Sequence, residues 1–344
     1  MTAPARAARK TSPSGRQPGA AHREASVARA SQPAERWAAL DIGSDTVHLL
    51  VMAVTRGPFG RLGMRQLEQR SILLELGREV ATRGRFGRAA IASLEGAVRR
   101  FVAVAHQLNA RLIVAATEAS REATNGPAVM ARLEQLTGTP ARILSGTREA
   151  QLGFLATRSA LPTSGIHLLV DSGGASTEVS IAAGRHLIGA ASLPIGAALL
   201  AASVPGDPPR PLPWALAAIR IAGVLGAAPA GRPNRLFATG GTAHNLAGLE
   251  RNRKGHPASV SLSIDELDNM TARLLRSSAA KIARASGEDP RRVALLAPGA
   301  LILAAIAQHY GLDGLTDVPE GVRDGMILAA ARDPGGWWAD QPSP

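Results

Sequence analysis

LLVDSGGASTEVS, at residues 168–180, places an apolar strand, a turn of small residues and a returning strand in direct succession. The same arrangement occurs earlier, in ALDIGSDTVHLLV at 39–51, where an aspartate again stands at the end of the first strand. Apolar runs on either side of a short turn of this kind are typical of a β-hairpin. An internal duplication of the unit predicts two similar lobes with a cleft between them.

Both turns have the composition of phosphate-binding turns. Their small residues allow backbone N–H groups to point outward and form an anion-binding nest, and the Ser and Thr hydroxyls add donors. Asp41 and Asp171 stand at the strand ends, where a carboxylate can hold Mg²⁺ directly or through water. A third turn, TGGT at 239–242, follows a predicted strand at 235–238 and opens a helix. One such turn alone is more often an ordinary tight hairpin, but three favour a site for a polyanionic phosphate.

The amino-acid composition limits the classes of protein to which the chain can belong. A chain of 344 residues with 45% hydrophobic residues can form two domains with a sizeable core. Aromatic residues are only 3% of the chain, which argues against a stacking surface for single-stranded nucleic acid. The absence of cysteine excludes disulfides and thiolate metal sites. The net charge of +12 favours polyanionic partners.

The pattern along the chain predicts its organisation. Residues 1–36 hold seven Lys or Arg against two Glu and show no apolar period, so we expect a disordered basic tail. The first lobe should span 37–126, with a C-terminal helix at 322–332 docking back onto it, and the second lobe should span 127–321. Residues 333–344 should form a second tail.

No segment predicts membrane insertion or secretion. The longest apolar run, 293–307, is short for a bilayer and is interrupted by Pro298 and Gly299, so it should be a buried helix. The N-terminus lacks the apolar core of a secretory signal. We therefore expect a cytoplasmic protein.

Two further motifs carry acidic residues that could do chemistry. In ATEASREATN, at 116–125, Arg121 can clamp a phosphate and Glu122 can deprotonate a water. In SGTREAQ, at 145–151, Ser145 can cap a helix whose first turns carry Glu149. The alternative in both cases is an acidic residue that stabilises the positive end of a helix dipole.

These segments, in this order, resemble the exopolyphosphatase / guanosine pentaphosphate phosphatase (Ppx/GppA) family of the actin-like ATPase and sugar kinase superfamily. The resemblance covers roughly residues 37–332 and implies an α/β fold of two ribonuclease H-like (actin-like ATPase) lobes around an inter-domain cleft. It rests on ALDIGSDTVHLLV (39–51), ATEASREATN (116–125), ILSGTREAQLGFL (143–155), LLVDSGGASTEVS (168–180), SLPIGA (192–197), ATGGTAHNLAGL (238–249), APGALIL (297–303) and GVRDGMIL (321–328).

The resemblance implies hydrolysis of the terminal phosphate of inorganic polyphosphate or of guanosine pentaphosphate, with Mg²⁺, or Mn²⁺ as the alternative ion. Glu122 matches the general base that activates water, and Arg121 would contact the terminal phosphate. Glu149 matches an acidic residue near the metal and the water. The metal would be held by Asp171, Glu149 and Asp41. The phosphates would be bound by the three turns: Gly43, Ser44, Asp45, Thr46, Gly173, Gly174, Ala175, Ser176, Thr177, Gly240, Gly241 and Thr242.

Five positions depart from the family pattern. Asp45 stands where the family usually has Asn, and Ala175 replaces a glycine. Arg148 replaces an acidic residue, and Glu75 stands where Arg is common. Arg142 occupies a position that is acidic in some members. A carboxylate a few Å from a phosphate costs on the order of 1–4 kcal/mol, so these changes put the activity in doubt.

The departures leave alternatives open. The main hypothesis is an exopolyphosphatase-like hydrolase, and the runner-up is a catalytically weak or inactive protein that binds polyphosphate or an alarmone. A kinase or ATPase of the wider superfamily is a third hypothesis. The chain looks like the short two-domain form, which favours shorter polyphosphate. A homodimer is left open, and neither a membrane nor nucleic acid is an expected partner.

Overall fold

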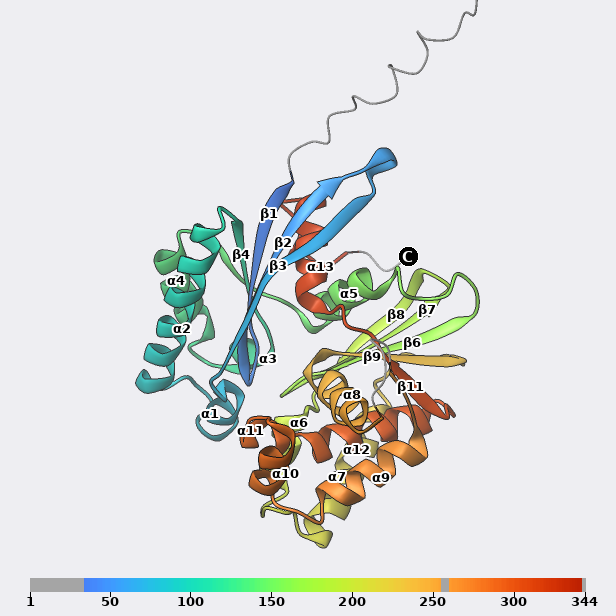
Figure 1. The fold of residues 1–344 in the computed structure, drawn as a ribbon. Coiled ribbons are helices and arrows are strands. Elements are labelled where there is room, and N and C mark those ends of the chain that lie inside the picture. The colour runs from blue at the N-terminus through green and yellow to red at the C-terminus, as the bar shows by residue number, and fades with distance from the viewer. Residues whose placement is uncertain (1–33, 255–259, 342–344) are drawn as a thin grey trace, which may run out of the picture.

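The computed structural model of the chain describes residues 34–254 and 260–341 (Figure 1). Two β-sheets, each flanked by helices, form the two lobes, as the duplicated hairpins predict. Of the predicted basic tail, residues 1–33 lie outside the described residues, and Glu35 and Arg36 already belong to the first strand.

The first sheet has the strand order β3-β2-β1-β4-β5. The pairs β1–β2 and β2–β3 are antiparallel, whereas β1–β4 and β4–β5 are parallel. The strands are β1 (Glu35–Ile42), β2 (Thr46–Arg56), β3 (Leu62–Leu73), β4 (Arg111–Ala116) and β5 (Ala141–Ile143), with a short 3₁₀ turn, η1 (Pro58–Gly60), between β2 and β3.

The second sheet has the order β10-β11-β9-β6-β7-β8. Its strands are β6 (Ile166–Ser172), β7 (Thr177–Ala183), β8 (His186–Leu193), β9 (Arg235–Thr239), β10 (Ser261–Ser263) and β11 (Gly314–Asp317). The pairs β6–β7 and β7–β8 are antiparallel, and β6–β9 and β9–β11 are parallel. Strands β8-β7-β6-β9-β11 therefore repeat the order and direction of β3-β2-β1-β4-β5.

The repeat extends to individual residues at the ends of the central strands. Asp41 on β1 pairs with His48 on β2, and Asp171 on β6 pairs with Glu178 on β7. In the turns between these strands, Gly43 N–H donates to Thr46 O at 3.1 Å, and Gly173 N–H donates to Ser176 O at 3.0 Å. The two lobes thus present the same turn at corresponding sheet ends.

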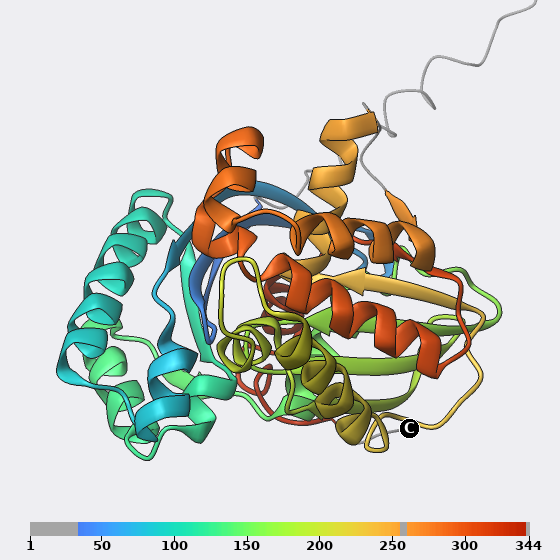
Figure 2. The same ribbon diagram turned by 90° about the horizontal axis from the view of Figure 1, so that it is seen from below.

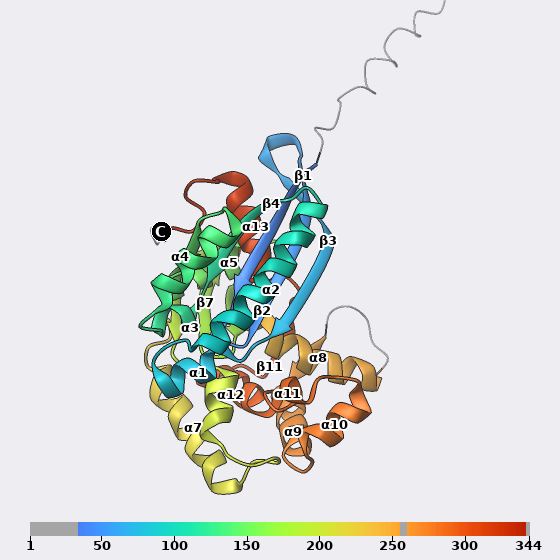
Figure 3. The ribbon, with the colours of Figure 1, turned by 90° about the vertical axis from the view of Figure 1, so that its left-hand side faces the viewer.

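Helices cover the outer face of the first sheet. They are α1 (Leu76–Arg83), α2 (Arg88–Gln107), the short α3 (Glu118–Glu122) and α4 (Gly126–Thr137). In α2 the buried residues recur at helical spacing, so that Leu94, Val98 and Phe101 meet the apolar face of β1 and β4. Figure 3 shows α2 lying across these strands.

Two helices fill the space between the sheets. They are α5 (Gly146–Thr157) and α13 (Val322–Arg332), which lie side by side in Figure 1. Leu152 of α5 and Ile327 of α13 share a core with Trp37 and Leu50 of the first sheet. Phe154, also on α5, packs against the second sheet.

The remaining helices cover the far face of the second sheet (Figure 2). They are α6 (Ala197–Ser203), α7 (Pro211–Leu225), α8 (Gly240–Lys254), α9 (Ile264–Leu274), α10 (Ala279–Ser286), α11 (Pro290–Val293) and α12 (Leu296–His309). By length and composition, one segment of the described chain, Pro290–His309, could cross a membrane, but 61% of its most apolar window is buried inside the protein. Ile302, Leu303 and Ile306 of α12 lie in the core of the second lobe, as expected for the apolar run.

The structure differs from the expected organisation in two places. The first sheet continues to Ile143, past the lobe boundary that we placed at residue 126, because a parallel β4–β5 pair needs the crossover helix α4 between its strands. The segment after α13 is also not a free tail. Trp337 is only 5% exposed and packs into the core between the sheets.

Candidate active site

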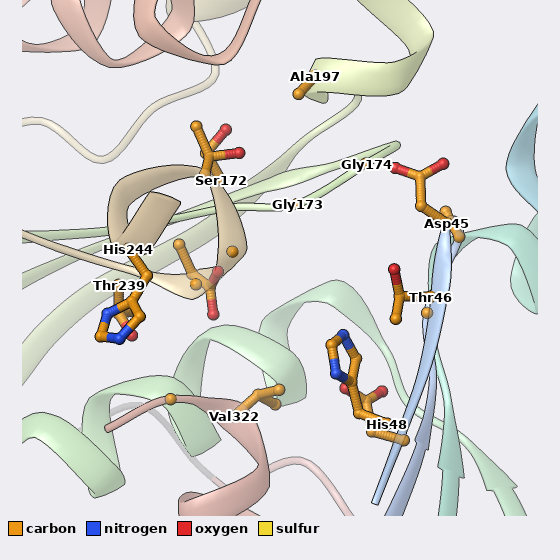
Figure 4. Close-up of a pocket in the computed structure, with 18 of the residues that line it drawn as sticks. Asp45, Thr46, His48, Ser172, Gly173, Gly174, Ala197, Thr239, His244 and Val322 are labelled. Carbon is orange, nitrogen blue, oxygen red and sulfur yellow. The ribbon is translucent and has the colours of Figure 1, made fainter. Parts of the chain in front are cut away.

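A pocket of about 510 Å³ opens where the corresponding ends of the two sheets face each other. All three glycine-containing turns reach it: the β1–β2 turn, the β6–β7 turn and the β9–α8 turn. Figure 4 shows Asp45 and Thr46 on one side, Ser172, Gly173 and Gly174 across from them, and Thr239, His244 and Val322 completing the wall.

Hydrogen bonds hold the first two turns in place. Asp45 O accepts from the N–H groups of Leu74 and Glu75 at 2.7 and 2.9 Å, and Ser44 Oγ accepts from Ala119 N–H at 3.3 Å. In the second lobe, Ala197 N–H donates to Gly173 O at 2.9 Å. These bonds position the turns before any substrate arrives, as electrostatic stabilisation of a phosphate requires.

The third turn depends on glycine itself. Gly240 has φ +83°, a left-handed conformation that L side chains rarely adopt. A Cβ at this position would overlap the carboxylate of Asp171. The backbone of the third turn therefore lies directly against the strand-end carboxylate of the second lobe.

Five carboxyl groups line the pocket. Those of Asp41 and Glu178 are buried, and those of Asp45, Glu149 and Asp171 are half-buried. Burial raises the pKa values of Asp41 and Asp171 to about 6, although the Arg323 guanidinium opposes the rise in both. Burial, and then the Asp171 charge, raises the pKa of Glu178 to about 8. Burial, followed by the Glu178 charge, holds the pKa of Glu149 well above its usual value. The pocket thus concentrates acids that a cation would stabilise in their charged form.

Glu149 Oε2 stands out among these groups because it is buried and accepts no hydrogen bond from the described part of the chain. Arg121 is the cation paired with it, and its Nη1 lies 3.9 Å away. Glu149 lies in the first turns of α5, whose N-cap Ser145 accepts from Arg148 N–H at 2.9 Å. A buried carboxylate oxygen that accepts no hydrogen bond and lines a polar pocket is suited to take up a ligand, a water or a metal ion.

Two arginines and His48 also line the pocket. Arg323 lies on α13, and Arg292 on α11 reaches across the pocket, where its Nη2 donates to Ser71 Oγ at 3.1 Å. His48 is half-buried, and desolvation, together with the positive charges of Arg323 and Arg292, keeps its pKa well below the usual range. The two guanidinium groups can therefore neutralise phosphate charge, while His48 stays neutral at pH 7.

The carboxylate oxygens of the pocket are ligands of the kind that a hard divalent cation such as Mg²⁺ prefers. The carboxylates lie beside the glycine-containing turns, and Glu149 Oε2 can accept a further bond. Within residues 34–254 and 260–341, however, no three Asp, Glu, His or Cys side chains are near enough to enclose an ion unaided. This is the arrangement expected for Mg²⁺, which is usually held by one or two carboxylates together with waters and substrate phosphates.

Most residues expected at the site do line the pocket, and three do not. Glu122 is exposed at the end of α3 and lies outside the pocket lining, so its assignment as the general base stays a prediction that the pocket geometry does not support. Arg121 also lies outside the lining, because its side chain pairs with Glu118 and donates to Leu144 O at 2.5 Å. Thr177 is fully buried, and its hydroxyl donates to Ile195 O at 2.6 Å.

The expected residues that line the pocket are Asp41, Gly43, Ser44, Asp45, Thr46, Glu149, Asp171, Gly173, Gly174, Ala175, Ser176, Gly240, Gly241 and Thr242.

The charge changes noted in the sequence divide into two groups. Asp45 lies against Gly174 in the pocket, and its pKa is raised to about 6 by burial and then by Glu75. Arg142 and Arg148 point elsewhere: Arg142 stacks 4.6 Å over the ring of Trp338, and Arg148 donates to Trp337 O. Neither of these two arginines therefore belongs to the lining of the pocket.

Several lining residues had no role in the sequence analysis. Glu178 directly follows the second turn, and Arg323 lies in GVRDGMIL, so both stood within segments that carried the resemblance. His48 could have been found from its hairpin register opposite Asp41. Arg292 lies in none of the motifs that the sequence analysis used, and only the tertiary structure shows that it lines the pocket.

Two lobes of the same strand order, with glycine-containing turns and carboxyl groups around a pocket between them, have the architecture of the actin-like ATPase fold. The sequence matches the model of the Ppx/GppA phosphatase family over residues 53–333, and the chain belongs to that family. The expected enzyme class, an exopolyphosphatase-like hydrolase, is confirmed by this membership.

Known relatives agree with the assignment. The chain is 29% identical to exopolyphosphatase 1 of Mycobacterium leprae over 304 residues, which cover 85% of this chain and 88% of the relative. It is 31% identical to an uncharacterised protein of Streptomyces coelicolor over 317 residues, which cover 89% and 93%.

Solved structures confirm the fold. An exopolyphosphatase from Cytophaga hutchinsonii matches with a TM-score of 0.78 at 20% identity, covering 87% of this chain and 98% of that one. The Aquifex aeolicus family member matches with a TM-score of 0.72 at 22% identity, covering 88% and 99%.

Proposed function

We propose that this protein removes the terminal phosphate of linear inorganic polyphosphate, with Mg²⁺, and that Glu149 activates the attacking water. One observation carries the proposal: the buried Oε2 of Glu149, which accepts no hydrogen bond from the described residues, lines a pocket that all three glycine-containing turns reach. The relatives named exopolyphosphatase, at 29% and 26% identity, support inorganic polyphosphate as the substrate.

The terminal phosphate would lie between the three turns. The N–H groups of Gly43 and Gly173 already donate within their turns, so other backbone N–H groups of the turns would receive the phosphate oxygens. Arg292 and Arg323 would neutralise part of the chain's negative charge. Phosphoryl transfer depends mostly on positioning and charge neutralisation, which these groups supply.

In the chemical step, a water beside Glu149 attacks the terminal phosphorus. Glu149 takes its proton, a new O–P bond forms, and the bond from phosphorus to the bridging oxygen breaks. Orthophosphate and a chain one unit shorter leave. A general base works best when its pKa lies near the working pH, and the raised pKa of Glu149 moves it in that direction.

Asp171 and Asp41 are the residues that would hold Mg²⁺, with phosphate oxygens and waters as the other ligands. When bound, Mg²⁺ would neutralise charge on the phosphate oxygens. Mn²⁺ is the alternative ion. We also expect the protein to act in the cytoplasm, and we keep guanosine pentaphosphate as the second candidate substrate of the same site.

One observation favours a second function, that of a catalytically weak protein that binds polyphosphate or an alarmone. The Asp45 carboxylate lies against Gly174, in the turn that should receive phosphate oxygens. Its charge opposes a bound phosphate whenever it is ionised, which lowers affinity and turnover.

A substrate panel tests the proposal. The purified full-length protein is incubated with polyphosphates of defined length, guanosine pentaphosphate or ATP, with Mg²⁺ or with a chelator, and orthophosphate is measured. We expect release from polyphosphate that depends on Mg²⁺, with little from ATP. Salt-sensitive binding without release at any chain length would instead favour the binding protein, and neither binding nor release would refute both.

A further inference from the structure

The nine residues after α13, Asp333–Gln341, form a strap across the first turn of α5. The segment leaves α13 and returns beside α5 in Figure 1. Trp337 anchors it in the core between the sheets, where only 5% of the residue is exposed.

Three side chains near the start of α5 bind the strap. The guanidinium of Arg148 is buried, and its Nε and Nη2 donate to Trp337 O at 3.0 and 2.6 Å. Gln151 Nε2 donates to Gln341 O at 2.8 Å, and Gln341 N–H donates back to Gln151 Oε1 at 3.0 Å. The N-cap Ser145 donates its hydroxyl to Asp340. The strap therefore holds the cap and the first two turns of the helix together.

The same turns carry Glu149. Because Oε2 of Glu149 accepts no hydrogen bond within residues 34–254 and 260–341, the position of its carboxylate is set largely by the helix backbone. Arg148 immediately precedes Glu149, so a bond that holds the backbone at 148 also fixes the point from which the catalytic side chain extends. A shift of about 1 Å in a catalytic group can cost about 100-fold in rate.

We propose that the strap positions Glu149 for hydrolysis by holding the first turns of α5, with Arg148 as the main positioning residue. The inference rests on the proposed function of Glu149. It also gives Arg148 a role away from the pocket lining. Glu149 remains the catalytic residue, because Arg148 acts only through the helix.

Arg148→Ala is the direct test, with Arg158→Ala as the matched control. Arg158 is exposed at the other end of α5, and its replacement removes the same charge. With polyphosphate and saturating Mg²⁺, we expect kcat to fall about 10–100-fold in Arg148→Ala while KM changes less than about threefold. Arg148→Lys, which keeps a donor for Trp337 O, should recover part of kcat. A folded Arg148→Ala variant with the kcat of Arg158→Ala would overturn the proposal.

Truncation tests the strap itself. A chain ending at Arg332 should show the same loss of kcat as Arg148→Ala, whereas one ending at Gln341 should match the full chain. If the shorter chain does not fold, Gln151→Ala replaces it. A folded chain ending at Arg332 that keeps the full kcat would overturn the proposal.

Amide hydrogen exchange reports on the helix without any substrate. Exchange at 148 and 149 should quicken in Arg148→Ala and stay unchanged near 157, because only the first turns of α5 lose their anchor. Unchanged exchange at 148 and 149 would refute positioning, whereas faster exchange in an enzyme without polyphosphatase activity would refute only the proposed function.

Discussion

Replacing Glu178 with Gln should make the folded protein more stable. Glu178 is buried on β7 beside Asp171 and Glu149, so their like charges repel one another when no divalent ion is supplied. Its Oε1 accepts from Ser192 Oγ at 2.7 Å, a bond that the Gln carbonyl can keep. The substitution therefore removes the electrostatic cost with little change in packing.

The pKa of Glu178 sets the size of the effect. Burial and then the Asp171 charge raise this pKa from 4.5 to about 8, so the folded protein at pH 7 holds a proton that the unfolded chain releases. The free energy of unfolding therefore falls as the pH rises from about 4.5 to about 8 and is flat above that range. At about 1.4 kcal/mol for each pKa unit, the carboxyl group costs on the order of 3 kcal/mol at pH 7.

Urea unfolding without divalent ions at pH 5, 7 and 8.5 measures this cost. Glu178→Gln should exceed the wild type by about 1–3 kcal/mol at pH 7 and 8.5, with a smaller difference at pH 5. Glu134→Gln, at an exposed position of α4, is the control and should show no such pH dependence. A Glu178→Gln variant that is less stable than the wild type at pH 8.5 would refute the reasoning.

Two other substitutions test the turns of the pocket. Asp45→Asn should lower KM for polyphosphate about 5-fold to 100-fold at pH 8, because it removes a charge of pKa about 6 that opposes phosphate. The gain should shrink at pH 5.5, where Asp45 is protonated in the wild type, and an equal gain at both values would contradict the charge argument. Gly240→Ala should lower kcat/KM at least 10-fold, since φ +83° and the Asp171 carboxylate leave no room for a Cβ. Gly241→Ala, where a Cβ would meet none of the described atoms within 4 Å, should have a much smaller effect.

The sequence predicted the parts of the fold that repeat. The two hairpins around Asp41 and Asp171 showed the duplication directly, because an apolar strand, a small-residue turn and a second strand are local features. The third strand of each lobe gave no such signal. β3 carries a polar, largely exposed sequence at a sheet edge, and its pairing with β2 is interrupted between Val51 and Met52.

Local sequence did not show which of two glutamates, Glu122 or Glu149, lines the pocket. Glu122 and Glu149 each follow an arginine in a short helical segment, so their local patterns are almost the same. They differ because α5 runs between the two sheets, whereas α3 ends at the surface of the first lobe. That placement depends on contacts between distant segments. Arg292 and the strap could not be predicted for the same reason, because their hydrogen-bond partners lie far away in the sequence.

The pair Glu149→Gln and Glu122→Gln tests the central claim most directly. Orthophosphate release from polyphosphate is measured for both variants at saturating Mg²⁺, together with polyphosphate binding. Glu149→Gln should lose about 100-fold to 10,000-fold in kcat and still bind, as expected when a general base is removed, whereas Glu122→Gln should turn over like the wild type. Loss of turnover in Glu122→Gln, with normal turnover in Glu149→Gln, would contradict the account.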